Sequence, residues 1–173
     1  MFTDITVQQI IERAGVSRAT FYAHFRNKDD VLLASFERMV LGLAQVLDTP
    51  ANRRDVRLVP MHELLDHFAS AGPVFRSLDA SGRMETLWNF ATDVLATLIE
   101  QRLPLFRATV TRRASAAPAD HLDERLTARM LAGACLELAR WWRTFPDRVA
   151  PLELDARFHA MARRVVAPAI FPV

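Results

Sequence analysis

The sequence predicts an all-α protein, and three observations support this prediction. Apolar residues recur at helical spacing along most of the 173 residues, and residues that favour helix caps precede several of these runs. No segment shows the alternation of apolar and polar residues, bounded by turn residues, that is typical of a half-buried strand. We therefore expect helices throughout, with a short helix-turn-helix near the N-terminus and a larger helical domain after it.

Two short helices joined by a tight turn are predicted first. Thr6 and Gln9 form a capping-box pattern at the start of the first helix, and Gly15 ends this helix. Ser17 is a suitable N-cap for the second helix, which extends to about Phe25. This arrangement is a helix-turn-helix, whose second helix can lie in the major groove of DNA.

A third helix and a domain boundary follow. Asn27 is a suitable N-cap for a helix that continues to about Asp48. Residues 49–60, TPANRRDVRLVP, contain two prolines and four charged residues, which is typical of a connection between units. We therefore expect an N-terminal module at 1–48 and a helical domain at 49–173.

Apolar patterns predict the helices of the C-terminal domain. The first pattern starts at Met61 and is interrupted at Gly72 and Pro73. A long apolar stripe then predicts a helix from Met84 to about Gln101, since Pro104 is expected to bend or break it.

Two further helices complete the prediction. The first runs from about Asp120 to Thr144, and its apolar positions are Leu122, Leu126, Leu131, Ala134, Cys135, Leu138, Trp142 and Phe145. The last helix is outlined by Leu154, Phe158, Met161 and Val165 and stops near Pro168.

Composition and charge exclude some classes of protein. With 51% hydrophobic and 24% charged residues, the chain is suited to build a core, and its single cysteine cannot form an internal disulfide. No apolar run approaches the ~18 residues of a membrane span, and MFTDITVQQI lacks the basic region of a signal peptide. We expect a soluble, cytoplasmic protein with no membrane partner. The net charge of +2 says little about partners, but residues 13–28 hold four cations and no acidic residue.

The second short helix has one apolar side and one polar side. Phe21 and Phe25 fall on the apolar side, where with Val16 they are expected to pack on Ile10 and Ile11. The polar side carries small residues suited to close approach to bases, with larger ones on its flanks: Ala19, Thr20, Ala23, Tyr22 and His24. Arg18 has the reach for guanine O6 and N7, and Thr20 for a thymine methyl group or a phosphate.

The string AGVSRATFYAHFRNKDDVL, Ala14 to Leu32, resembles the DNA-binding segment of the tetracycline-repressor (TetR) family of bacterial transcriptional regulators. The resemblance covers about residues 2 to 40. It implies that Arg18, Ala19 and Thr20 meet bases. The remaining predicted DNA-binding residues are then Thr6 and Gln8 at the start of the supporting helix, the N-cap Ser17, Tyr22 and His24 at the phosphate backbone, and Lys28 at a phosphate.

One feature departs from the family. Members carry a further helix before this string, which packs across the two short helices, whereas only FTDI lies between Met1 and Thr6. Either upstream residues are absent from this sequence or the module is incomplete. An incomplete module is expected to be mobile over residues 1–26 and to bind DNA weakly or not at all.

The resemblance also implies an apolar effector cavity in the C-terminal domain. Trp88 is the best single candidate for its wall, because a large ring with a polar N–H suits ligand orientation. The predicted pocket residues are Phe68, Phe75, Leu87, Trp88, Phe90, Phe106 and Cys135. The alternative, that these are only core residues, stays open.

In the family the last two long helices form a four-helix dimer interface, which implies a homodimer. Small residues let two helix axes approach closely. The predicted interface residues are Ala128, Ala132, Ala139, Trp142, Phe158, Met161 and Val165. The alternative is that they pack inside one subunit. Trp141 and Trp142 diverge around the helix, so one of them is expected at a subunit interface or at the surface.

No sequence motif indicates catalysis, a cofactor or a metal. The five histidines include no HExxH, and GxGxxG, GxxxxGK[ST] and GxSxG are absent. The sequence therefore predicts a non-enzymatic, ligand-responsive homodimeric regulator, a repressor released from a palindromic DNA operator by a small apolar effector. The alternative is a helical small-molecule-binding or dimerisation protein whose DNA-binding module does not function.

Overall fold

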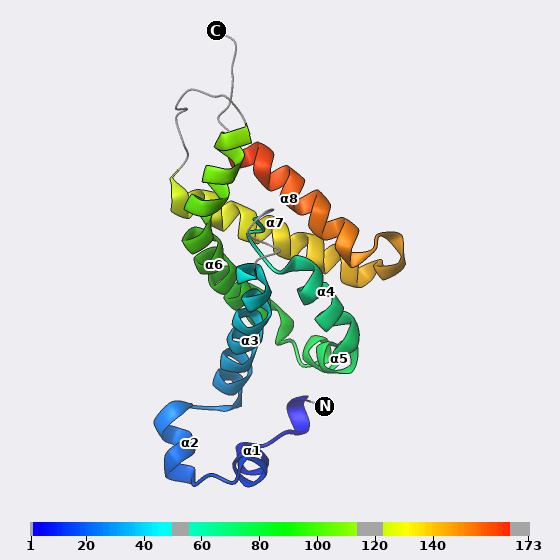
Figure 1. Ribbon diagram of the computed structural model, residues 1–173. Coiled ribbons are helices and arrows are strands. Elements are labelled where there is room, and N and C mark those ends of the chain that lie inside the picture. The colour runs from blue at the N-terminus through cyan, green and yellow to red at the C-terminus, as the bar shows by residue number, and fades with distance from the viewer. Residues whose placement is uncertain (1, 50–55, 114–122, 167–173) are drawn as a thin grey trace.

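The computed structural model describes residues 2–49, 56–113 and 123–166, and every regular element in these ranges is a helix (Figure 1). The all-α prediction is confirmed. The α-helices are α1 (Val7–Ala14), α2 (Arg18–His24), α3 (Lys28–Ala44), α4 (Met61–Ser70), α5 (Gly72–Ala80), α6 (Met84–Arg113), α7 (Glu124–Thr144) and α8 (Pro151–Val166). Three short 3₁₀ helices accompany them: η1 (Phe2–Asp4), η2 (Gln45–Asp48) and η3 (Pro146–Arg148).

Helix α3 connects the two short N-terminal helices to the rest of the chain. It begins as predicted, because the Asn27 side chain accepts a hydrogen bond from the N–H of Asp30 at 2.9 Å. It continues into η2, which ends at Asp48. In Figure 1, α1 and α2 lie at one end of the molecule and α7 and α8 toward the other, with α3 and α6 between them.

Helix α6 is longer than predicted. It passes through Pro104 and ends at Arg113, so the expected end near Gln101 is wrong. A proline inside a helix costs about 3 kcal/mol, because it removes one backbone hydrogen bond and crowds the preceding turn. Leu103 and Phe106 are fully buried beside it, and burial of each such side chain stabilises the fold by about 1.5 to 3 kcal/mol. Packing on the core side therefore outweighs the cost of the proline, which is exposed.

One hydrophobic core extends from the second half of α3 to α8. It begins at Phe36 and includes the buried faces of α4, α5, α6, α7 and α8. Among the described residues, α6 and α7 form the most extensive helix pair, and α8 packs mainly on α4. Ile11 and Phe21 are buried but lie outside this core, so α1 and α2 form a small contact of their own.

The predicted boundary segment is mostly buried from Val56 on, whereas Thr49 is exposed. Val56, Leu58 and Val59 belong to the main core, whereas residues 50–55 lie outside the described residues. The division into residues 1–48 and 49–173 stays a prediction.

The beginning and end of α7 differ from the sequence pattern. The helix starts at Glu124 with Asp123 as its N-cap, while 120–122 lie outside the described residues. Leu126 and Phe145, which were expected on the buried stripe, are exposed. Both stand at the ends of the helix, where the neighbouring helices do not cover them.

Candidate DNA-binding and effector sites

Helices α1 and α2 meet at a tight turn at Gly15. The Thr6 hydroxyl accepts a hydrogen bond from the N–H of Gln9, and Gln9 Oε1 accepts one from the N–H of Thr6 at 2.8 Å, which completes the predicted capping box. Gly15 has a φ of 65°, a left-handed conformation that glycine adopts without a Cβ clash. Ser17 Oγ accepts a hydrogen bond from the N–H of Thr20 at 3.0 Å, so the predicted N-cap of α2 is also present.

The inner side of α2 is apolar, as predicted, but Val16 in the preceding turn does not join this contact. Phe21 is buried, and its ring centroid lies 5.7 Å from that of Phe25. Ile11 is buried on α1. Val16 was expected in the same contact but is 39% exposed, because it belongs to the turn before α2 and not to the helix itself.

The outer side of α2 and the start of α1 are open to solvent. Eight of the nine predicted DNA-binding residues are exposed: Thr6, Gln8, Ser17, Arg18, Ala19, Thr20, Tyr22 and His24. The Tyr22 ring stands edge-on to Phe21 at 5.2 Å, yet 56% of this residue remains exposed. A partner as large as duplex DNA therefore meets no obstacle from the described part of this chain at α2.

Lys28 differs from the other eight residues. Its Nζ donates hydrogen bonds to the carbonyl oxygens of Phe2, Thr3 and Ile5 at 2.9, 3.2 and 2.8 Å. The same ammonium group lies 4.9 Å from the centroid of the Phe2 ring. An ammonium group has three N–H donors, so all three are used within the chain. Lys28 therefore holds η1 against the start of α3, and in this structure its N–H donors are used within the chain.

The comparison with protein families agrees with this geometry. Residues 2–35, which span η1, α1, α2 and the first turns of α3, match the model of the bacterial regulatory proteins of the tetR family. Over this module the chain is similar to the TetR family. TetR-family proteins are DNA-binding transcriptional regulators, which fits the exposed outer side of α2. No curated protein and no solved structure matches the chain.

Three of the aromatic residues predicted to line an effector cavity pack on one another. Phe68 stands edge-on to Phe75 at 4.7 Å and to Trp88 at 5.8 Å, and all three are buried. The guanidinium group of Arg140 lies 5.2 Å from the Trp88 ring centroid. Trp88 is therefore enclosed by protein groups, which corresponds to the alternative that it is a core residue.

A mostly apolar pocket of about 230 Å³ lies beside this cluster, between α3 and the helices α4, α5 and α6. Two of the predicted residues, Phe75 and Leu87, line it, whereas the other five do not. The remaining lining residues are Leu32, Ser35, Phe36, Met39, His67, Ala71, Val74 and Leu78. Sequence reasoning missed the contribution of α3, because a pattern of apolar residues on one helix does not reveal which neighbour it faces.

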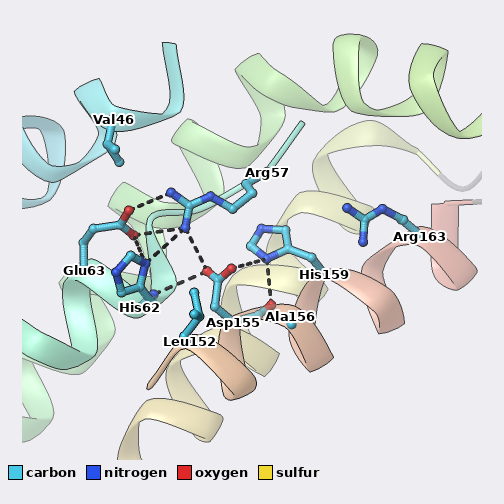
Figure 2. Close-up of a pocket in the computed structure, with 9 residues that line it drawn as sticks. All are labelled: Val46, Arg57, His62, Glu63, Leu152, Asp155, Ala156, His159 and Arg163. Carbon is cyan, nitrogen blue, oxygen red and sulfur yellow. Dashed lines mark hydrogen bonds and ion pairs between the residues drawn. The ribbon is translucent and has the colours of Figure 1, made fainter. Parts of the chain in front are cut away.

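A second cleft, of about 490 Å³, is lined in part by a cluster of charged side chains and was not predicted (Figure 2). It lies where η2, the segment before α4, α4 itself and α8 come together. At its centre Arg57 pairs with Glu63, Nη2 to Oε1 at 2.6 Å, and with Asp155, Nη1 to Oδ1 at 3.3 Å. Burial by itself raises the pKa of Asp155, but the hydrogen bond from His159 and the charge of Arg57 outweigh it, so this pKa lies below its ordinary value.

His159 completes this polar network. Its Nε2 accepts a hydrogen bond from the N–H of Leu58 at 3.0 Å, which assigns the ring proton to Nδ1. Nδ1 then donates to the carbonyl oxygen of Asp155 at 2.9 Å. The polar groups of this network bond to one another and hold the segment before α4 against α8. The network therefore has a structural role. The residues stand about a hundred positions apart, and no local pattern could have paired them.

Most of the predicted dimer-interface residues lie inside one chain. Ala128, Ala132, Ala139, Trp142 and Phe158 are buried in the core of the single chain, which corresponds to the alternative that they pack inside one subunit. Small residues allow close approach between helices of one subunit as well as between subunits, so their place in a dimer interface stays a prediction. Met161 and Val165 are exposed and stay candidates. Trp142 is held by a hydrogen bond from its Nε1 to the carbonyl oxygen of Val149 at 2.8 Å, whereas Trp141 faces outward, as expected for one of the pair.

The last two helices carry an exposed apolar surface that the prediction only partly included. On α7 the exposed large apolar residues Leu126, Met130 and Trp141 fall on one side, since they are spaced by about whole helical turns. On α8 they include Met161 and Val165, also one turn apart, whereas Leu152 stands about half a turn away around the helix. We call the other five residues the α7–α8 apolar surface.

Within the described ranges, no group of three His, Cys, Asp or Glu side chains is placed to hold a metal ion. Cys135 is buried, and burial raises the pKa of its thiol to about 12, which leaves it protonated and unreactive. None of the described helices is long and apolar enough to cross a membrane.

Proposed function

We propose that the chain is a homodimeric transcriptional repressor that leaves a near-palindromic DNA operator when a small apolar molecule binds its C-terminal domain. The observation that carries this proposal is the exposed outer side of α2, which holds Arg18, Ala19 and Thr20 in a module that matches the TetR family. Ala19 lets the helix approach base edges closely, and Arg18 can donate two hydrogen bonds to a guanine. Tyr22 and His24 stand on the flanks, where the phosphate backbone runs in such a complex.

The α7–α8 apolar surface supports the dimer. Exposed apolar side chains gathered on one face are typical of a surface that a partner covers. A second copy of the chain packs there with two-fold symmetry, so each residue of the surface meets its own counterpart or a neighbour. A two-fold dimer presents two α2 helices to DNA, and this requires matching half-sites in the operator.

The apolar pocket between α3 and α4–α6 supports the effector response. Its volume of about 230 Å³ is below the roughly 300–1,000 Å³ of most ligand pockets, so the effector is a small molecule. Nearly all of its lining side chains are apolar, and Ser35 and His67 are the residues that can hydrogen bond to a polar group of the effector. Since α3 forms one wall, a bound molecule acts directly on the helix that follows the DNA-binding module.

The far end of α3 is fixed, which gives its movement a direction. Arg102 of α6 donates hydrogen bonds to the carbonyl oxygen of Leu47 at 2.9 Å and to Asp48 Oδ1 at 2.7 Å. It also donates to the carbonyl oxygen of Arg57 at 3.2 Å. The start of α3 is held by the partly exposed ion pair between Asp29 and Arg83. A molecule in the pocket breaks this pair and displaces the N-terminal half of α3, and with it α1 and α2, about the Arg102 anchor. The separation of the two α2 helices then no longer matches the half-sites.

Two experiments test the proposal. Enrichment of bound sequences from a pool of randomised duplexes by the full chain is expected to yield an inverted repeat, and recovery of no motif contradicts DNA recognition. Ala71→Phe places a ring in the pocket and imitates the effector, so it is expected to weaken binding to the enriched duplex about 5- to 150-fold. The control is Ala80→Phe at the exposed end of α5, which is expected to bind normally. Normal binding by a folded Ala71→Phe variant contradicts the effector mechanism.

A further inference from the structure

Three exposed side chains on the outer side of α1 and α2 form a chain of hydrogen bonds. Arg18 on α2 donates from Nε and Nη2 to the single oxygen Oε1 of Gln8 on α1, at 3.3 and 3.0 Å. Gln8 donates from Nε2 to Oε1 of Glu12, one turn later on α1, at 2.7 Å. The order is therefore Glu12, Gln8, Arg18, and it crosses from the supporting helix to the recognition helix.

Glu12 determines which end of the Gln8 amide faces Arg18. A carboxylate only accepts hydrogen bonds, so it selects the NH₂ group of the amide and turns the amide oxygen toward Arg18. The opposite orientation places the NH₂ group against the guanidinium N–H groups and the oxygen against the carboxylate, which are two repulsive contacts. Without Glu12 only the repulsion between the NH₂ group and the guanidinium N–H groups favours this orientation, so Gln8 accepts from Arg18 for a smaller part of the time.

Gln8 in turn determines which N–H groups of Arg18 remain for DNA. The edge formed by Nε and Nη2 is used by Gln8, and no other described residue is bonded to this guanidinium group. The end of the group, formed by Nη1 and the second N–H of Nη2, is open. Two parallel N–H groups in a fixed plane match O6 and N7 of a guanine. An arginine held in this way has already lost the side-chain freedom that it would otherwise lose on binding.

We propose that Gln8 and Glu12 are positioning residues that set the guanine specificity of Arg18. This inference rests on the proposed function, because it needs α2 in a major groove. Gln8 acts by holding the guanidinium plane, and Glu12 acts through Gln8 alone.

The proposal gives Glu12 two effects of opposite sign. Its negative charge lies beside the exposed cations of the module and repels DNA phosphates, so its removal strengthens binding to DNA of any sequence. Its removal also frees the Gln8 amide, so the preference for guanine at one position weakens. Removal of a residue that only supports the fold of α1 lowers both the affinity for DNA of any sequence and the preference for guanine. The sign of the change in affinity therefore separates the two roles.

The test uses the full chain and the motif that the wild-type chain enriches from randomised duplexes. Affinities are measured for the enriched duplex, for the same duplex with each guanine replaced in turn, and for a scrambled duplex. Arg18→Ala is expected to abolish discrimination at one guanine, a loss of about ten- to a hundredfold. Gln8→Leu, which keeps the size of the side chain and removes its acceptor, is expected to reduce discrimination at that same guanine roughly three- to tenfold.

Glu12→Ala is expected to bind the scrambled duplex more tightly and to discriminate less at the same guanine. Arg13→Ala is the matched control: it removes an exposed charge from the neighbouring position and is expected to weaken binding of all duplexes equally. In the double variant Arg18→Ala with Gln8→Leu, the second change is expected to have no further effect on discrimination.

Three results overturn the inference. One is full discrimination in Gln8→Leu, and another is a uniform loss of affinity in Glu12→Ala. The third is a wild-type motif with no guanine that depends on Arg18. If the wild-type chain enriches no motif at all, the proposed function fails together with the inference.

Discussion

Asp29 at the start of α3 and Arg83 before α6 form an ion pair, in which Arg83 Nε lies 3.0 Å from Asp29 Oδ1. The same guanidinium group lies 5.6 Å from the centroid of the Phe2 ring, and the N–H of Phe2 donates to the hydroxyl of Ser77. These contacts tie η1 and the start of α3 to α5 and α6. They lie at the end of α3 opposite to the Arg102 anchor, next to the module that carries α1 and α2.

Arg83→Gln is expected to loosen the N-terminal module and to leave the C-terminal domain intact. The pair is partly exposed, so its loss lowers the free energy of unfolding by no more than about 1 kcal/mol. Hydrogen exchange is expected to show faster exchange of the α1 and α2 amides and unchanged α7 amides. Arg157→Gln breaks an exposed ion pair with Glu153 on α8 and serves as the control. Identical α1 and α2 exchange in all three chains contradicts the role of Arg83.

Tyr22→Ala and Tyr22→Phe are expected to weaken binding of the enriched duplex with little effect on folding. If the Tyr22 hydroxyl donates to a phosphate, each variant loses one hydrogen bond, which corresponds to about a two- to tenfold loss of affinity. Tyr22→Phe keeps the ring that stands against Phe21, so its thermal unfolding is expected to equal that of the wild-type chain. Fluorescence anisotropy measures the affinity for the duplex, and calorimetry measures thermal unfolding. Unchanged affinity in both variants contradicts a contact between Tyr22 and DNA.

Met130→Glu with Met161→Glu is expected to convert the dimer to folded monomers. Both methionines are exposed on the α7–α8 apolar surface, at 50% and 37%, so a carboxylate there is solvated in the monomer but buried without a partner in the dimer. Ala132→Arg is not a useful alternative, because Ala132 is fully buried in the single chain and the change is expected to unfold it.

Sedimentation equilibrium checks the prediction. Leu41→Glu is the control, since Leu41 is equally exposed but lies on α3, and this variant is expected to remain dimeric. A wild-type chain that is monomeric at micromolar concentration contradicts the proposed dimer without any variant.

Asp155→Asn is expected to lower the free energy of unfolding at neutral pH and to lower it by a smaller amount at acidic pH. The pKa of Asp155 is lower in the folded chain than its ordinary value of 3.8, so the ionised carboxylate stabilises the fold above that value. This contribution is lost as the pH falls below 3.8 and through the native pKa. At pH 7 the loss is expected to be about 1 to 3 kcal/mol, because Arg57 and the N–H of His62 keep only a weaker acceptor.

Urea unfolding at pH 7 and near pH 3 measures this effect. The difference between wild type and Asp155→Asn is expected to shrink at the lower pH. Asp66→Asn, on the exposed side of α4, is the control and is expected to change stability little at either pH. A difference that grows in acid contradicts the assigned direction of the pKa shift.

The beginnings of the N-terminal helices could be predicted from sequence because their causes are local. Thr6, Ser17 and Asn27 each bond to a backbone N–H within three residues, and Gly15 turns the chain by its own φ. The end of α6 could not be predicted in this way. The cost of Pro104 is local. The burial of Leu103 and Phe106, which outweighs this cost, depends on contacts with other helices.

The residues of the candidate sites also differ in whether their surroundings depend on local or on distant parts of the chain. The exposed side of α2 follows from helical spacing alone, and eight of the nine predicted DNA-binding residues on α1 to α3 are exposed. Lys28 is the exception, because its partners are carbonyl oxygens of η1 more than twenty positions away. Whether Trp88 lines a cavity or Ala132 an interface depends on which helix faces it, and apolar spacing gives the same signal in both cases.

The central claim is that the outer side of α2 binds DNA. Hydrogen exchange of the full chain, measured without and with the enriched duplex, tests it most directly. We predict that the amides of α1 and α2 exchange more slowly when the duplex is bound, while those of α8 are unchanged. Slower exchange in α7 and α8 with no change in α1 and α2 would contradict the claim.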